Sequence, residues 1–334
     1  MTHRCGYLAG ARAFKLLRCM IGLVGLLVVA HSHAQTFPAR PVRLVVPFAA
    51  GGLTDVVIRL MAPEMEKGLG QPAIIENRPG GGSAAGISYV AKAPPDGYIS
   101  GFISAGAMVI QPVIQKDFPY DPVKDLAPVG LVFQAPLIWS VKADSPWKSV
   151  RDLVAYAKAN PGKLTFGTNG AGDLPHLLIE LLKDEAGINI VPVHYKGEAP
   201  AFQDFLGGRI DVTTAGYGTL EQYLKSGSVR TIAQLGDTRS SLYPDLPTAK
   251  EQGFANVVGT GWLGMVAPAG TPKDALNKLS DSLGRAARSQ AVRDKLATQY
   301  AVPVGSTPEA FAEFVQQQRA RLTPILKRLD IKTD

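Results

Sequence analysis

Residues 42–61 read VRLVVPFAAGGLTDVVIRLM, and this stretch governs how the rest of the chain is interpreted. Arg43 to Pro47 is expected to be a buried strand, because a run of apolar residues suits a parallel strand covered on both faces. The loop Ala49-Ala50-Gly51-Gly52 follows, and a helix is predicted to begin near Thr54 or Asp55, either of which can cap it. Unpaired first-turn N–H groups of such a helix form a seat for an anion. An ordinary strand–turn–helix connection is the alternative.

The first 34 residues are interpreted as a secretory signal peptide. Met20 to Ala30 is a short apolar core, and Ser32-His33-Ala34 places small residues before a cleavage point between Ala34 and Gln35. The apolar run is too short for a comfortable membrane span. Ahead of it lie four basic residues: Arg4, Arg12, Lys15 and Arg18. Both cysteines, Cys5 and Cys19, are lost with this segment, so we expect a periplasmic protein without disulfides.

Length and charge narrow the function classes further. A chain of 334 residues can hold two domains, each with its own core. The formal net charge of +7 falls to +3 when the four basic residues of the signal peptide are removed. Since no cluster of Lys and Arg interleaved with aromatic residues remains, we expect no nucleic-acid partner. His176 and His194 are the histidines left, without cysteine, which argues against a transition-metal site, and no cofactor is expected.

A second strand–loop–helix unit repeats the first one. Lys163 to Phe166 is the expected strand, and the glycine-rich loop Gly167 to Asp173 follows it. The next helix carries leucines at helical spacing and ends at Gly187. Two such helix N-termini facing each other across a cleft would hold one anionic ligand between them. His176, one turn into this helix, either faces the ligand or supports the loop from behind.

Two long segments are expected to cross between domains. Leu126 to Val141 is too long and too marked by proline for one ordinary strand, and Val229 to Leu235 is expected to return to the first domain. This places the first domain in residues 35–134 and 235–334 and the second in residues 135–234. A domain interrupted by another in this way is a hinge architecture. Within the first domain, Pro63 is expected to kink or break the first helix.

A glycine run beginning at Gly80 imitates a nucleotide-binding fingerprint. Gly80, Gly82 and Ala85 have the G-x-G-x-x-A spacing, but the acidic residue expected about 20 residues later is missing. Neither a G-x-S-x-G elbow nor the G-K-[ST] of a phosphate loop is present. The sequence thus favours a binding protein over an enzyme, and a hydrolase using His176 or His194 is the alternative from another class.

The chain resembles the Bug family, the periplasmic solute receptors of tripartite tricarboxylate transporters. The matching motifs occur in the family's order over essentially the whole mature chain. They are Pro47 to Asp55, Glu76 to Gly80, Pro95 to Tyr98, Asn160 to Lys163, Gly167 to Leu177, Tyr195 to Gly197, Pro244 to Thr248 and Pro268 to Pro272.

The resemblance implies an α/β chain with the type II periplasmic-binding-protein fold, in which two α/β domains are joined by two crossing strands around a ligand cleft. It implies a monomer that binds a small organic acid and passes it to membrane permease subunits; a receptor for a membrane sensor kinase is the alternative. Carried over by position, the ligand-binding residues are Ala49, Gly51, Gly52, Leu53, Asp55, Thr168, Asn169, Gly170, Ala171, Gly172, Asp173 and His176.

Asp173 departs from the family pattern, which commonly has a serine at this position. If its carboxylate faces the cleft, it should repel ligand carboxylates and select a ligand with few of them and with a hydrogen-bond donor. The alternative is that Asp173 only caps its own helix. Bulk at Gly52 or Gly170 is expected to weaken binding if the backbone of the two loops holds the ligand.

Overall fold

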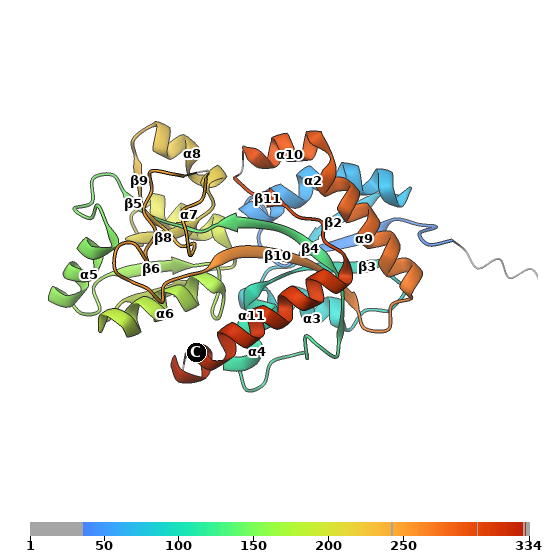
Figure 1. The fold of residues 1–334 in the computed structure, drawn as a ribbon, viewed down its shortest axis with the longest axis horizontal. Helices are drawn as coiled ribbons and strands as arrows, with labels where there is room; N and C mark the ends of the chain where they lie inside the picture. Colours follow the sequence, from blue (N-terminus) through green and yellow to red (C-terminus); the bar gives the residue numbers. More distant parts are fainter. Residues whose placement is uncertain (1–35, 242, 299, 330, 332–334) are drawn as a thin grey trace, which may run out of the picture.

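The chain folds into two α/β lobes, each built on one sheet (Figure 1). The computed structural model describes residues 36–241, 243–298, 300–329 and 331. The expected signal peptide and its cleavage point lie outside these residues. Among them, no helix is both long and apolar enough to cross a membrane.

The first lobe contains a six-stranded sheet in the order β11-β4-β10-β3-β1-β2. Strand β1 lies between β2 and β3 and is parallel to both, as the apolar run predicted. Strand β10 is antiparallel to β3 and to β4. The strands are β1 (Val42–Val46), β2 (Ala73–Asn77), β3 (Ile99–Ser104), β4 (Leu126–Pro136), β10 (Thr260–Pro268) and β11 (Val302–Pro303).

The second lobe contains a five-stranded sheet in the order β7-β6-β8-β5-β9. Strand β6 is parallel to β7 and β8, and β5 is antiparallel to β8 and β9. The strands are β5 (Ile138–Lys142), β6 (Thr165–Thr168), β7 (Val191–His194), β8 (Val212–Ala215) and β9 (Val229–Gln234).

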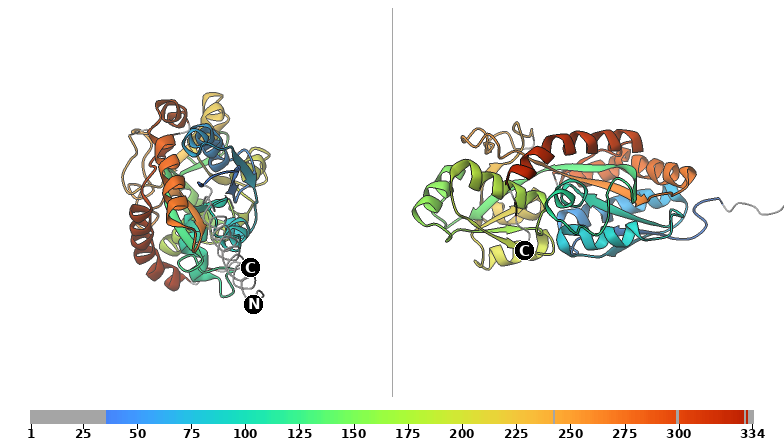
Figure 2. Two further views of the ribbon diagram at one scale, coloured as in Figure 1. Left: turned by 90° about the vertical axis from the view of Figure 1, so that its right-hand side faces the viewer. Right: turned by 90° about the horizontal axis from the view of Figure 1, so that it is seen from below.

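Helices cover both sheets, and the views in Figure 2 show the two lobes side by side along the long axis. The helices of the first lobe are α2 (Leu53–Leu69), η1 (Gly81–Ser83), α3 (Ala84–Ala91), η2 (Gly106–Ile110), α4 (Gln111–Ile114), α9 (Lys273–Arg288), α10 (Gln290–Ala297) and α11 (Pro308–Leu329). Those of the second are α5 (Val150–Ala159), α6 (Leu174–Ala186), α7 (Glu198–Leu206) and α8 (Tyr217–Lys225).

The chain passes between the lobes at two neighbouring points, the first of them inside the expected segment Leu126 to Val141. The expected return strand, Val229 to Leu235, instead forms β9 of the second sheet. Strand β4 belongs to the first sheet and β5 to the second, and Leu137 joins them. The N–H of Leu235 donates to the carbonyl of Leu137 at 2.9 Å, and the N–H of Gly259 donates to the carbonyl of Leu235 at 2.7 Å. The two crossings therefore lie side by side, where a hinge can bend both together.

The segment 235–259 contacts the second lobe, although the sequence interpretation placed it in the first. The side-chain amide of Gln252 accepts from the N–H of Val150 and donates to the carbonyl of Ile232, both at 2.8 Å. The chain therefore returns to the first sheet only at β10. Loop composition alone does not reveal such packing.

Helix α2 is continuous through Pro63, so the expected break is absent. Pro63 lies on the exposed face of the helix, where water can satisfy the carbonyl that loses its intrahelical partner. The helix ends at Gly70, which has φ 75° and whose N–H donates to the carbonyl of Glu66. A glycine in this left-handed conformation is a common helix end.

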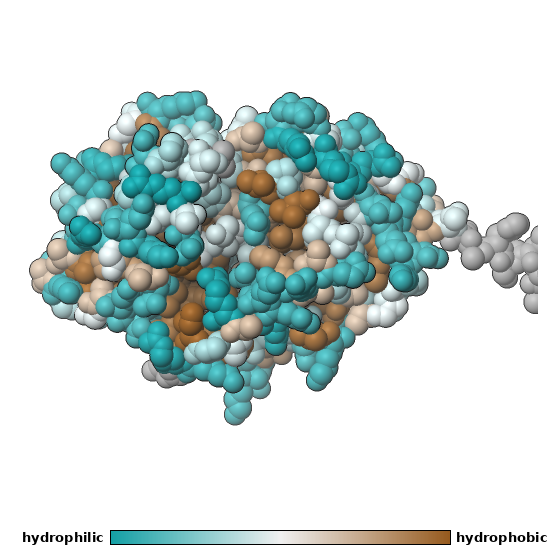
Figure 3. Space-filling view, in the orientation of Figure 1, coloured by the Kyte–Doolittle hydropathy of each residue, from teal (hydrophilic) through white to brown (hydrophobic). Residues whose placement is uncertain are grey.

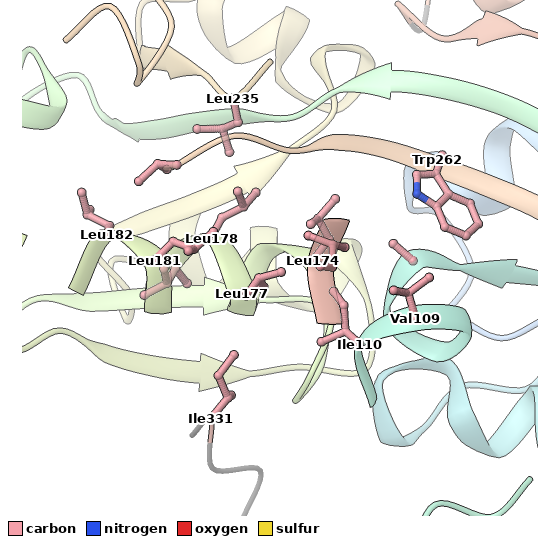
Figure 4. Packing of buried hydrophobic residues seen from close by; sticks show 14 of the residues in the cluster. Val109, Ile110, Leu174, Leu177, Leu178, Leu181, Leu182, Leu235, Trp262 and Ile331 are labelled. Carbon is pink, nitrogen blue, oxygen red and sulfur yellow. The ribbon is translucent and has the colours of Figure 1, made fainter. Parts of the chain in front are cut away.

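The apolar core extends from one lobe into the other. The leucines of α6 point into it, as their spacing predicted, and Figure 4 shows Leu174 beside Ile110 of the first lobe. Trp262 of β10 belongs to the same cluster. Hydrophilic residues cover most of the face drawn in Figure 3, and a hydrophobic patch lies over β11, where Val302 is exposed. The lobes thus meet through buried apolar side chains as well as polar contacts.

Candidate functional site

The first glycine loop joins β1 to α2 and is held by Asp55. Gly52 is the N-cap of α2 without a side-chain cap, so the expected capping by Thr54 or Asp55 does not occur. Asp55 instead accepts from the N–H of Gly51 at 3.0 Å. It also accepts from Arg59 at 3.0 Å and from Asn77 at 2.9 Å. Burial opposes the charge of Asp55, but these donors outweigh it and hold the pKa of the carboxyl below its usual value.

The second glycine loop joins β6 to α6 and is held by Asp173. Its Oδ1 accepts from the N–H of His176 at 2.8 Å, and its Oδ2 accepts from the N–H of Asn169 at 2.7 Å. Both oxygens thus bind backbone of the loop and helix, which is the capping geometry. Burial raises the pKa of Asp173 to about 7, against the hydrogen bonds that favour its charged form.

His176 is buried behind the second loop. Its Nδ1 accepts from the N–H of Gly172 at 3.0 Å, and its ring lies 4.5 Å from that of His194. His194 in turn is 2.7 Å from the hydroxyl of Thr168 through Nδ1. Burial, with the neighbouring His176, lowers the pKa of His194 to about 4. This pair supports the loop from behind.

A cavity of about 100 Å³ lies between the lobes, below the two loops. Of the residues expected from the sequence, it is lined by Ala49, Gly52, Leu53, Asp55, Asn169 and Asp173. The others lie outside the lining, either in the same loops or in the strand and helix that flank the second loop: Gly51, Thr168, Gly170, Ala171, Gly172 and His176. The two loops that the sequence singled out therefore converge on one cavity.

Much of the lining is apolar and comes from residues that the sequence interpretation did not count among the ligand-binding ones. The apolar residues among these are Phe48, Ala105, Phe133, Ala135, Leu137, Leu174, Pro175, Trp262 and Leu263. Trp262 and its neighbours come from β10, and Phe133 and Ala135 from β4, so the two crossing strands form part of the wall. Among the described residues, no group of three or more His, Cys, Asp or Glu side chains is arranged to hold a metal ion.

The sequence interpretation missed Glu198, an acidic residue that lines the cavity. It opens α7, and its carboxylate accepts from the hydroxyl of Thr219 at 2.5 Å and from the N–H of Gly216 at 3.2 Å. The N–H of Leu53, in the other lobe, also donates to it. Burial raises the pKa of Glu198, against these donors. The sequence feature that could have identified Glu198 is its position directly after the motif Tyr195 to Gly197.

Backbone contacts join the lobes at the rim of the cavity. The N–H of Ala49 donates to the carbonyl of Lys196 at 3.2 Å. The side-chain amide of Gln111 donates to the carbonyl of Gly81 at 2.7 Å and to that of Ala171 at 2.8 Å, so one buried side chain holds a loop from each lobe. These hydrogen bonds join the two lobes beside the cavity.

Comparisons with known proteins agree with this architecture. The family model described as "Tripartite tricarboxylate transporter family receptor" matches residues 57–331. Protein BugT of Bordetella pertussis is 34% identical over 308 residues, which cover 91% of this chain and 94% of BugT. The structure of the periplasmic binding protein BugD has a TM-score of 0.84 at 34% identity, covering 89% of this chain and all of that one. An R. palustris protein solved with adipate has a TM-score of 0.82 at 32% identity, covering 88% and 98%.

Proposed function

Since this chain belongs to the receptor family of tripartite tricarboxylate transporters, we propose that it captures one small organic carboxylate between its lobes and delivers it to membrane permease subunits. The relative solved with adipate supports a carboxylate as the ligand class. The receptor performs no chemistry on its ligand in this proposal. It works in the periplasm, to which a signal peptide cleaved near Ala34 and Gln35 exports it.

The observation that carries this proposal is the cavity at the junction of two lobes joined by two adjacent crossings. A ligand in such a cavity touches both lobes when they are closed and one lobe when they are apart. It therefore favours the closed state by the contacts that only this state provides. A membrane partner that recognises the closed state then receives loaded receptors in preference to empty ones.

The first loop supplies most of the proposed anion contacts. The N–H groups of Thr54 and Asp55 belong to the first turn of α2 and have no acceptor inside the helix. The helix dipole adds to their attraction for a carboxylate. In the second loop, Asn169 lines the cavity, and the remaining family positions, including His176, shape the loop from outside the lining.

A thermal-shift screen of small carboxylates tests the proposal. The mature chain, beginning at Gln35, is heated with each compound, and matched alcohols and sugars serve as controls. A ligand that binds the folded state alone raises Tm in a concentration-dependent way. At least one carboxylate should do so while its matched alcohol does not. No shift with any carboxylate across the panel would contradict a carboxylate receptor.

A further inference from the structure

The charged side chains that line the cavity are all acidic. They are Asp55, Asp173 and Glu198, and among the described residues no Lys, Arg or His belongs to the lining. A site built for two ligand carboxylates needs cations or several free N–H groups to offset their charge. The question is then how many free N–H groups the two helix N-termini provide.

The N-terminus of α6 provides few free N–H groups, because a side chain of the helix cap already accepts from one and a proline lacks another. Asp173 takes the N–H of His176, and Pro175 has no N–H to offer. In the first turn this leaves the N–H of Leu174. The Asp173 carboxyl already occupies the position where a ligand carboxylate would benefit from the dipole of this helix.

The N-terminus of α2 is filled in part by Glu198. The carboxylate of Glu198 takes the N–H of Leu53, the first residue of that helix, and bridges it to Gly216 and Thr219 of the second lobe. Thr54 and Asp55 keep free first-turn N–H groups, enough for one carboxylate. Three donors also leave Glu198 one of its roughly four acceptor positions.

The other lining residues with polar side-chain groups are Thr54, Ser104, Asn169 and Trp262, and the side-chain oxygen of Asn169 is an acceptor. Within the described residues, the buried side-chain oxygen of Asn169 has no hydrogen-bond partner, and Asn169 lines the cavity. A buried acceptor without a partner is costly, so a ligand that donates to it gains from the contact. A hydrogen-bond donor on the ligand would therefore satisfy this oxygen, whereas a second carboxylate would not.

We infer that Glu198 sets the charge class of the ligand: the cavity takes an organic acid with a single carboxylate and a hydrogen-bond donor or cationic group at its other end, and rejects dicarboxylates. This inference rests on the proposed function and narrows it. It also extends to Glu198 the selection that the sequence suggested for Asp173, whose carboxyl serves as the cap of α6.

Two series of matched compounds test the inference by isothermal titration. Adipate, 6-aminohexanoate and hexanoate share a chain length and differ at one end, as do succinate, 4-aminobutyrate and butyrate. In the series that binds the wild type, the amino acid should bind at least about tenfold more tightly than the dicarboxylate, since like charges repel strongly in a partly dry cavity.

Glu198→Gln removes the charge but keeps an acceptor for Thr219 and the backbone donors. This variant should reduce the preference for the amino acid over the dicarboxylate by at least about tenfold. Glu198→Asp, which keeps the charge, should retain a preference. Glu221→Gln is the matched control, because Glu221 pairs with Lys225 on α8 outside the cavity lining.

Four results would overturn the inference. The first is a dicarboxylate as the tightest ligand of the wild type, which leaves the proposed carboxylate receptor intact. The second is a folded Glu198→Gln variant that keeps the full preference for the amino acid over the dicarboxylate. The third applies if Glu198→Gln does not fold: it is a Glu198→Asp variant that has lost this preference. The fourth is the absence of binding by every compound in both series; the broader thermal-shift screen then decides separately whether the carboxylate receptor itself fails.

Discussion

Gly170→Ala should block closure of the lobes while leaving each lobe folded. Gly170 lies in the second loop, and a Cβ built on it would stand 2.5 Å from the Cα of Gly82 and 2.9 Å from its N. Both atoms are backbone of the other lobe, so no side chain can move aside. The shorter distance falls 0.9 Å below the 3.4 Å at which ordinary contact begins.

The magnitude follows from the cost of overpacking. An added methyl group in a close-packed region costs about 1–3 kcal/mol. Here the cost falls on the closed state, because the clash disappears when the lobes separate. Since a ligand must supply that free energy to close the lobes, Kd should rise about 5- to 160-fold.

The assay is isothermal titration with the tightest carboxylate found by the thermal-shift screen. Gly170 has φ 155°, so a side chain there also strains the backbone. Gly187→Ala is the matched control, because Gly187 has φ 62° in the same lobe and no atom within 4 Å of a built Cβ. The control should lose stability and keep its affinity. Equal affinities for the two folded variants would refute the steric argument.

Two further predictions concern buried polar groups. Gln111→Leu removes the hydrogen bonds to Gly81 and Ala171, of which the bond to Ala171 joins the lobes. Ligand binding, titrated beside the wild type, should weaken about fivefold, at roughly 1 kcal/mol for that bond; unchanged affinity would show that the link does not hold the closed state. Asp173 has a pKa raised from 3.8 to about 7, so its contribution to stability is full below about pH 4 and is lost as the pH rises through 7. Asp173→Asn keeps a capping oxygen without this titration, so Tm measured from pH 4 to 8 should fall less for the variant than for the wild type, and parallel profiles would contradict the raised pKa.

The repeated strand–loop–helix units were predictable because their signals are local. The apolar run of β1, the leucine spacing of α6 and the glycine at its end each point to one structure. By contrast, η2 and α4 (106–114) were missed. Their apolar residues continue those of β3, and periodicity does not separate a buried strand from a buried helix in such a run.

The charge of the cavity could not be predicted from the sequence, because it depends on which group each carboxylate meets. For Asp173 the sequence left capping and ligand contact equally open, and the contacts made by its two oxygens support capping. Glu198 meets Leu53 of the other lobe, a partner 145 residues earlier in the chain. Only the arrangement of the lobes brings them together.

Small-angle scattering of the mature chain, with and without a saturating carboxylate ligand, tests ligand-driven closure most directly. If the ligand favours the closed state, its addition should lower the radius of gyration of the wild type. At one ligand concentration that saturates Gly187→Ala but lies below the Kd of Gly170→Ala, Gly170→Ala should keep a larger radius than Gly187→Ala. A radius that does not change when a tightly bound ligand saturates the wild type would contradict closure of the lobes as the response to binding.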